Sequence, residues 1–210
     1  MDEIQRKDNK EISKHLKIIC GKTMQALIDS YMFMFPAAYK YDNKDTFMFR
    51  YSYYAFRQKA ILSVKKLIEP AKTDKITLQY LVQLLTQSDI SILSEQEKAA
   101  LKADYDTLFS SEHALRIKKF RDAFCHNLSN SNEAMCYHKD IMYVINGSLH
   151  ILEQLYTITE SSLPTFFTEA RNIAEYLASN YWKALDIAAK NSNNNHDINA
   201  KLQKLLDGEF

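Results

Sequence analysis

The chain has 210 residues, of which 46% are hydrophobic and 25% charged, and its formal net charge is +1. These values are typical of a soluble globular protein with one buried core, and they exclude a chain that binds nucleic acid through a uniformly basic surface. Any basic site must therefore be local.

Residue usage also indicates few, long elements and a reducing compartment. The chain has only 3 glycines and 3 prolines, fewer than the turns of a sheet protein of this size need. Its 3 cysteines, Cys20, Cys125 and Cys136, have no regular spacing and indicate no disulfide framework. The charged N-terminus lacks the apolar core of a signal peptide, and no apolar run is long enough to span a bilayer. We expect a cytoplasmic protein without a membrane partner.

Helical periodicity runs through most of the chain. Apolar residues recur at three- and four-residue steps, which is the spacing of one helix face. The predicted helices span residues 4–35, 46–69, 78–86, a pair from about 95 to 125, 139–159 and 165–190. We therefore expect an all-α fold, a helical bundle of five or more helices in which long helices run antiparallel.

Prolines and capping residues predict where these helices begin and end. Pro36 is expected to end the first helix, and Thr77 is expected to cap the third. Ser94 and Glu97 have the spacing of a capping box, which opens the fourth helix. Ser110-Ser111 is expected to break or bend the chain before the next helical segment.

Composition divides the chain into one domain and a short tail. Residues 1–190 are predicted to form a single helical domain, residues 191–195 a polar linker, and residues 196–210 a tail helix. Aromatic residues and methionines are dense between Tyr31 and Phe56, which predicts a thick core or a subunit interface. The alternative is that one or two exposed tyrosines in this segment stack on bases.

The segment Arg121-Asp122-Ala123-Phe124-Cys125-His126 places an arginine, an acid and a histidine near the end of a predicted helix. On an ideal helix Ile117, Phe120 and Phe124 share the side that faces the core, and Asp122 and His126 are neighbours on the opposite, polar side. Arg121 and His126 lie roughly 140° apart around the axis. The three side chains therefore share one site only if the helix ends near Cys125 or a second copy of the segment closes it.

Arg121, Asp122 and His126 suit chemistry on RNA, and we predict them as catalytic. An arginine offers a planar fork of donors to a phosphoryl group, and a histidine exchanges protons near neutral pH. A basic cluster and the polar loop that follows it supply the predicted RNA-binding residues, Arg116, Lys118, Lys119 and Asn127. The alternative is that a surface arginine and a helix-capping histidine account for the pattern.

Cysteines and histidines around this segment raise the alternative of a zinc site. The four residues are Cys125, His126, Cys136 and His138. Their spacing matches no regular structural zinc pattern, so we predict no metal and no cofactor.

Residues 121–126 resemble the signature of the HEPN superfamily, in which an arginine is followed by a polar residue and, after four to six intervening residues, by a histidine. Upstream, residues 65–73 and the leucine-rich segment 78–81 resemble the abortive-infection AbiU-like branch. In that branch a long helix ends in a similar Leu-x-x-Pro turn before a short leucine-rich helix. A tyrosine often lies two residues after the histidine in toxins that a nucleotidyltransferase modifies, and this chain has Leu128 there.

The resemblance implies a HEPN-like helical bundle that dimerises and brings two motifs together in a cleft. It also implies a metal-independent endoribonuclease that acts as a toxin or phage-defence effector, with RNA, a second copy and a cognate antitoxin as partners. Arg121 would bind the scissile phosphate, His126 would transfer protons, and Asp122 would orient either of them. The products would be a 2′,3′-cyclic phosphate and a 5′-hydroxyl end. A catalytically inactive helical binding module is the alternative.

Overall fold

The structure, a computed structural model, describes residues 3–39, 41, 47–69, 77–87, 93–126, 136–158 and 165–193. These residues form helices and no strand, which confirms the predicted all-α fold. The helices are α1 (Glu3–Ala38), α2 (Phe47–Leu67), α3 (Leu78–Gln87), α4 (Glu95–Ser110), α5 (Glu112–His126), α6 (His138–Ile158) and α7 (Thr165–Asn193).

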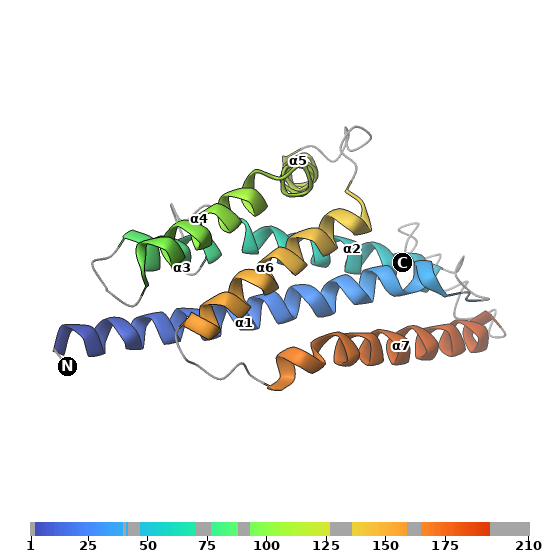
Figure 1. Cartoon of the computed structure of the whole chain (residues 1–210). Helices are drawn as coiled ribbons and strands as arrows, with labels where there is room; N and C mark the ends of the chain where they lie inside the picture. The colour runs from blue at the N-terminus through green and yellow to red at the C-terminus, as the bar shows by residue number, and fades with distance from the viewer. Residues whose placement is uncertain are drawn as a thin grey trace, which may run out of the picture.

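The long helix α1 lies at the centre of the bundle and packs against α2, α3, α6 and α7 (Figure 1). Helix α2 runs antiparallel to it, because Phe33 late in α1 contacts Tyr53 early in α2, with ring centroids 5.2 Å apart. Asp29, one turn earlier in α1, accepts a hydrogen bond from Ser63, later in α2, at 2.6 Å. The predicted antiparallel arrangement of long helices is therefore confirmed for this pair.

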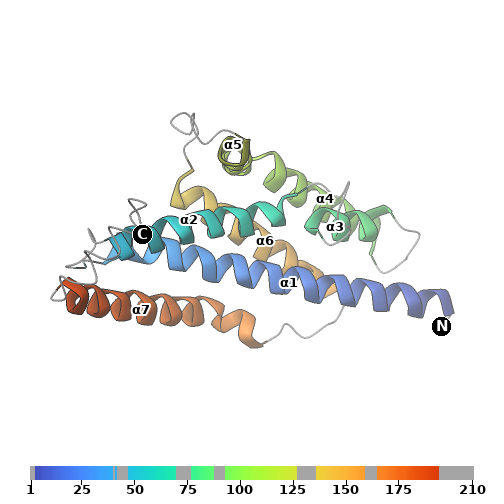
Figure 2. The same cartoon turned by 180° about the vertical axis from the view of Figure 1, so that it is seen from behind.

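The other helices cover α1 from two sides. Helices α4 and α5 lie on one side of α1 and α7 lies on the other, as views from the front and from behind both show (Figures 1 and 2). Helix α5 packs against α2, α4 and α6, whereas α7 packs against α1 and α2. The main core contains residues of all the helices from α1 to α7. It includes the fully buried side chains of Ile19, Leu27, Ile61, Leu67, Ile117 and Ile141.

Two predicted helix caps are confirmed. The Tyr80 backbone N–H donates to Thr77 Oγ1 at 3.1 Å, so Thr77 caps α3. At the start of α4, the Glu97 backbone N–H donates to Ser94 Oγ at 3.3 Å, and the Ser94 backbone N–H donates to Glu97 Oε2 at 2.8 Å. This reciprocal pair is the capping box that the sequence predicts.

The predicted break at Ser110-Ser111 is also confirmed. Helix α4 ends at Ser110, α5 begins at Glu112, and Ser111 lies at the corner between them. The corner is stabilised by Ser111 Oγ, which accepts from the Ala114 backbone N–H at 3.1 Å and so caps α5.

The predicted end of the first helix is wrong, because α1 continues past Pro36 to Ala38. Proline lacks the backbone N–H that would donate to the carbonyl four residues earlier, and this lost bond is what was expected to end the helix. Here Trp182 Nε1, on α7, donates to the Met32 carbonyl at 2.7 Å. A tertiary contact thus satisfies the acceptor that Pro36 leaves without its helical partner.

The predicted linker is wrong at its start, since α7 continues through residues 191–193 before the described part of the chain ends. Asparagine and serine are weak helix formers. Here they continue a helix that is already held by packing, because Trp182 and Ala189 are fully buried. The rest of the linker and the predicted tail helix at 196–210 lie outside the described residues.

Tyr105, in α4, carries a buried hydroxyl that has no hydrogen-bond partner among the described residues. Burial raises the pKa of this phenol well above its ordinary value. Tyr105→Phe keeps the ring, which stacks on Phe109 at 5.6 Å, and removes the unsatisfied group. We expect the free energy of unfolding to stay unchanged or to rise by up to about 1 kcal/mol in urea denaturation. The exposed Tyr51→Phe should change nothing, and a clear loss of stability in Tyr105→Phe would contradict the expectation.

Candidate functional site

Helix α5 presents the residues predicted as catalytic, and its buried face sets their direction. Ala114 and Ile117 are fully buried and Phe120 is nearly so, which fixes this face against the core as the sequence predicts. The opposite face carries the exposed side chains of Lys119 and Asp122. Of the predicted catalytic residues, Asp122 therefore lies on the outer surface of α5.

Arg121 and Asp122 form an ion pair at this surface. Arg121 Nη1 donates to Asp122 Oδ1 at 2.7 Å, and the two side chains are 30% and 58% exposed. A pair in contact with water contributes at most about 1 kcal/mol to folding. Arg121 also borders a hollow of about 10 Å³ that Gln58, Ile61 and Leu62 of α2 line together with Phe120. The arginine thus lies at the junction of α2 and α5.

His126 occupies the last helical position of α5. Because the chain stays helical through Cys125, positions 121 and 126 remain roughly 140° apart around the axis. A site shared by Arg121 and His126 needs side chains that reach around the helix, or a second copy. The side chains of Phe124, Cys125 and His126 and all of the predicted RNA-binding residue Asn127 lie outside the described residues.

Arg116, predicted to bind RNA, makes its contacts within the protein. Its Nε and Nη2 donate to Asp140 Oδ1 at 3.0 and 2.8 Å, and its Nη1 donates to Glu112. The guanidinium is 23% exposed, whereas Asp140 is fully buried. Arg116 therefore ties α5 to α6.

The two predicted lysines differ in their surroundings. Lys118 Nζ lies 3.2 Å from the centroid of the Phe109 ring and donates to the Phe109 carbonyl at 3.3 Å. Burial, and then the nearby Lys65, lower the pKa of Lys118. Lys119 is exposed on the outer face of α5, beside Asp122. Of the predicted RNA-binding cations on α5, Lys119 lies closest along the helix to the predicted catalytic residues.

A polar cluster around Asp140 was not predicted. Asp140 Oδ1 lies 2.6 Å from His113 Nδ1 and also accepts from Arg116, while Oδ2 accepts from the Tyr137 backbone N–H at 2.8 Å. Burial would raise the pKa of Asp140, but the hydrogen bonds from Arg116, His113 and Tyr137 outweigh it, and the pKa lies below its ordinary value. The position of Asp140 in the first turn of a helix is the only sequence signal, and it indicates a cap rather than a cluster.

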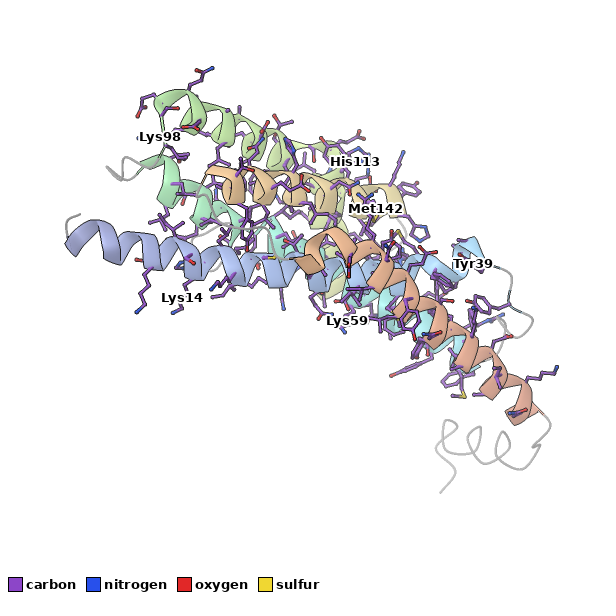
Figure 3. The ribbon with its side chains drawn as sticks, turned by 60° about the horizontal axis from the view of Figure 1, so that its bottom comes forward. Lys14, Tyr39, Lys59, Lys98, His113 and Met142 are labelled. Atoms are coloured by element: carbon purple, nitrogen blue, oxygen red, sulfur yellow. The ribbon has the colours of Figure 1, made fainter. Side chains whose placement is uncertain are left out.

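The tautomer of His113 follows from these contacts. An ionised Asp140 only accepts, so His113 Nδ1 must carry the proton that it donates at 2.6 Å. Arg116 Nη2, 3.1 Å from the same nitrogen, is also only a donor, so that approach is not a hydrogen bond. His113 lies on the side of the bundle away from Lys14 and Lys59 (Figure 3). Its ring is 27% exposed and packs on Tyr143.

A groove between α4 and α6 was also not predicted, and its volume is about 260 Å³. Its polar and apolar lining residues are Asp104, Thr107, Leu108, Tyr143, Asn146, Gly147, His150 and Ile151. A side chain at Gly147 would place its Cβ 2.7 Å from Leu108 Cδ1, so glycine permits this close approach of the two helices. Gln154 donates to Asp104 at 2.7 Å and lies 3.0 Å from His150 Nε2.

The residues of the zinc alternative are only partly described. Cys136 is buried, which raises its pKa to about 12, and the His138 ring packs edge-on against Phe33 with centroids 4.5 Å apart. Among the described side chains, no three His, Cys, Asp or Glu are grouped as metal ligands. Cys125 and His126 are not among those side chains.

Comparisons with known proteins add no relative. Protein-family models, curated proteins and solved structures all give no match to this chain. Within the described helices, none combines the length and the apolar character that a membrane span needs.

Proposed function

We propose that the protein is a metal-independent endoribonuclease of the HEPN type, which acts as a toxin or phage-defence effector. The observation that carries the proposal is the exposed Arg121–Asp122 pair on α5, one turn before the terminal helical residue His126. An all-helical bundle holds this segment at its surface by the buried face of α5. The motif's resemblance to the HEPN signature supplies the reaction class.

In the proposed reaction the RNA 2′-hydroxyl oxygen attacks the adjacent phosphorus, and the bond to the 5′-oxygen breaks. Arg121 binds the nonbridging phosphate oxygens, where negative charge develops in the transition state. His126 takes a proton from the 2′-hydroxyl or gives one to the leaving 5′-oxygen, and Asp122 holds Arg121 in place. The products are a 2′,3′-cyclic phosphate and a 5′-hydroxyl end.

A second copy of the chain is part of the proposal. Positions 121 and 126 are roughly 140° apart on one helix, so two copies of α5 that face each other bring an arginine and a histidine from different chains together. RNA and a cognate antitoxin protein are the further proposed partners.

The test uses Arg121→Ala and His126→Ala proteins, incubated with total RNA and with tRNA in EDTA. Loss of a proton-transfer group typically lowers the rate about 10²- to 10⁴-fold, and we expect a loss of that size for His126→Ala. Loss of a donor to the developing negative charge lowers it about 10²- to 10³-fold, and we expect that for Arg121→Ala. Analysis of the cleaved ends should find 2′,3′-cyclic phosphates. Lys183→Ala, an exposed cation on α7, is the matched control and should keep full activity.

A mixture of the two inactive variants tests the shared site. If Arg121 and His126 act from different chains, mixed dimers contain one intact site, and part of the activity returns on mixing. Full cleavage by the His126→Ala protein alone would contradict the nuclease proposal. If the mixture stays inactive, Arg121 and His126 act from the same chain.

The second candidate is a catalytically inactive helical module that associates with protein or RNA. It is favoured by one observation, that Arg116, predicted to bind RNA, instead donates to the buried Asp140. This candidate predicts no cleavage by the wild type. If its partner is RNA, the affinity should fall steeply as the salt concentration rises.

A further inference from the structure

Helix α7 has two apolar faces, and the bundle covers only one of them. The covered face includes Ala174, Trp182 and Ala189, which are fully buried, and α7 packs against α1 and α2. On the other side, Ile173 and Ile187 lie roughly 180° and 140° around the helix axis from Trp182, and they are 36% and 62% exposed. No other helix of the described residues lies on the side of α7 away from α1 (Figures 1 and 2).

The exposed apolar residues of α7 share one face, which we call the outer stripe. Its members lie within about 80° of one another around the axis and are all exposed, namely Ile173, Leu177, Ala184 and Ile187. A helix that is apolar on two sides is typical of one that is buried on both. A row of exposed apolar side chains also marks a surface that contacts another element or chain. The outer stripe therefore fits an apolar helix laid along it.

The sequence that follows α7 has the pattern of a short amphipathic helix. Its apolar residues recur at three- and four-residue steps, namely Ile198, Leu202, Leu205 and Leu206. Asp197 is a favourable N-cap before the first of them, and Gly208, soon after the last, is typical of the position past a helix end. The pattern predicts a helix over residues 198–207, roughly 15 Å long.

The length of the connection favours α7 as the neighbour of this segment. Helix α7 ends at Asn193, so residues 194–197 join it to the predicted helix. A connection of about 2–5 residues is typical of two antiparallel helices that pack side by side. In such a hairpin Leu202 comes to about the level of Ile187, and Leu205 to about the level of Ala184. Apolar side chains then face the outer stripe.

Charge and length define how far this contact extends. Lys201 comes to about the level of Asp186, which follows the flank of the outer stripe, so a cation faces a carboxylate. The predicted helix ends before it reaches Asn180, a polar residue in the middle of the stripe. Ile173 and Leu177, on the N-terminal side of Asn180, therefore lie beyond its reach.

We propose that residues 198–207 form a helix that docks antiparallel on the C-terminal half of the outer stripe, with Leu202 and Leu205 against Ile187 and Ala184. The covalent connection favours this occupant over a second copy or another protein, because a short tether gives an effective concentration of the order of millimolar. The docked helix removes the Ile187 side chain from water, and α7 becomes buried on two sides. The proposal is independent of the ribonuclease reaction, which uses residues of α5.

The first test is chemical cross-linking of the full chain at positions beside the proposed contact. Cys20 and Cys136 are buried, and Cys125→Ser removes the third native thiol. In that background Lys190→Cys is combined with Lys201→Cys, which leaves every apolar residue of the contact in place. The control combines Glu175→Cys with Lys201→Cys, because position 175 lies beyond the reach of the segment. With a short bismaleimide, we expect the first pair to give about tenfold more cross-link within one chain, measured by mass spectrometry.

The second test is limited trypsin digestion, which cleaves after Lys201 and Lys204. Ile187→Ser removes an apolar partner of the segment and should raise the rate of these cleavages about tenfold, since proteolysis follows the population of the undocked state. Leu177→Ser changes an exposed residue of the same stripe outside the contact and should be cleaved like the wild type. Circular dichroism checks that both variants keep the helical bundle.

Three results would overturn the proposal. One is an equal yield of cross-link from the two cysteine pairs. Another is tail cleavage in the wild type that is as fast as in Ile187→Ser. The third is a cross-linked product of twice the mass of the chain and none within one chain, which would mean that a second copy covers the outer stripe.

Discussion

Replacement of Asp140 by alanine is expected to lower the free energy of unfolding by about 3–5 kcal/mol, the range for breaking a buried ion pair from one side. The fully buried carboxylate receives hydrogen bonds from three groups: His113 and Arg116 on α5, and the Tyr137 backbone N–H at the start of α6. Its loss leaves these donors without their acceptor and weakens the contact between α5 and α6. Urea denaturation followed by circular dichroism measures the change.

The matched control is Asp122→Ala, which removes an acid from the surface of α5. Its carboxylate is 58% exposed and contacts Arg121, so we expect a loss below about 1 kcal/mol. Asp140→Asn keeps an acceptor for the Tyr137 N–H and removes the charge, and its loss should be intermediate. Equal stability of Asp140→Ala and Asp122→Ala would contradict the role of the buried cluster.

The contribution of Asp140 should depend on pH with a defined sign. Its pKa is lower in the folded state than its ordinary value of 3.8, because hydrogen bonds favour the ionised form. The unfolded chain therefore binds its proton first as the pH falls. The difference in the free energy of unfolding between wild type and Asp140→Asn should be largest above pH 3.8, the ordinary pKa. It should shrink as the pH falls through the pKa of the folded state.

Replacement of Trp182 by alanine is expected to cost about 3–5 kcal/mol, the range for deleting a large buried aromatic. Trp182 is fully buried in a second cluster with Phe49, Met32 and Leu185, and this cluster fixes α7 to α1 and α2. Trp182→Phe tests the hydrogen bond more specifically, because it keeps an aromatic ring and removes the Nε1–H that donates to the Met32 carbonyl at 2.7 Å. We expect it to cost about 1–3 kcal/mol, as a buried acceptor is left unsatisfied.

A double-mutant cycle with Pro36→Ala isolates the hydrogen bond. Alanine at position 36 restores the backbone N–H that donates to the carbonyl of Met32 within the helix. The cost of Trp182→Phe should therefore be smaller in the Pro36→Ala protein than in the wild type. Urea denaturation of the four proteins gives the coupling energy. An equal cost in both backgrounds would mean that the indole N–H does not replace the missing helical donor.

Local chemistry accounts for the parts of the fold that were predicted correctly. The three- and four-residue apolar spacing predicted the helices, and short-range caps at Thr77 and Ser94 predicted two of their starts. The same spacing placed Ile117 and Phe120 toward the core, and so placed Asp122 on the outer face of α5. These features depend on residues within one or two turns of each other.

The candidate site was predicted only in part. Its residues on α5 were chosen from a local motif, and the structure brings Arg121 and Asp122 into contact. Arg116 was predicted to bind RNA, but its contact with Asp140 joins residues 24 positions apart, which no local pattern reveals. The groove between α4 and α6 combines residues from separate helices in the same way.

The sequence by itself determined the helices, most of their boundaries and the buried face of α5, because these follow from side-chain spacing and backbone capping. Only the tertiary structure decided that α1 continues through Pro36, since the replacement donor, Trp182, is 150 positions away from Met32 along the chain. It also decided that Arg116 binds the buried Asp140 and that Phe47, Tyr51 and Tyr54 of α2 stay exposed. Those outcomes depend on how helices pack on one another, and helix packing brings together side chains that the sequence keeps far apart.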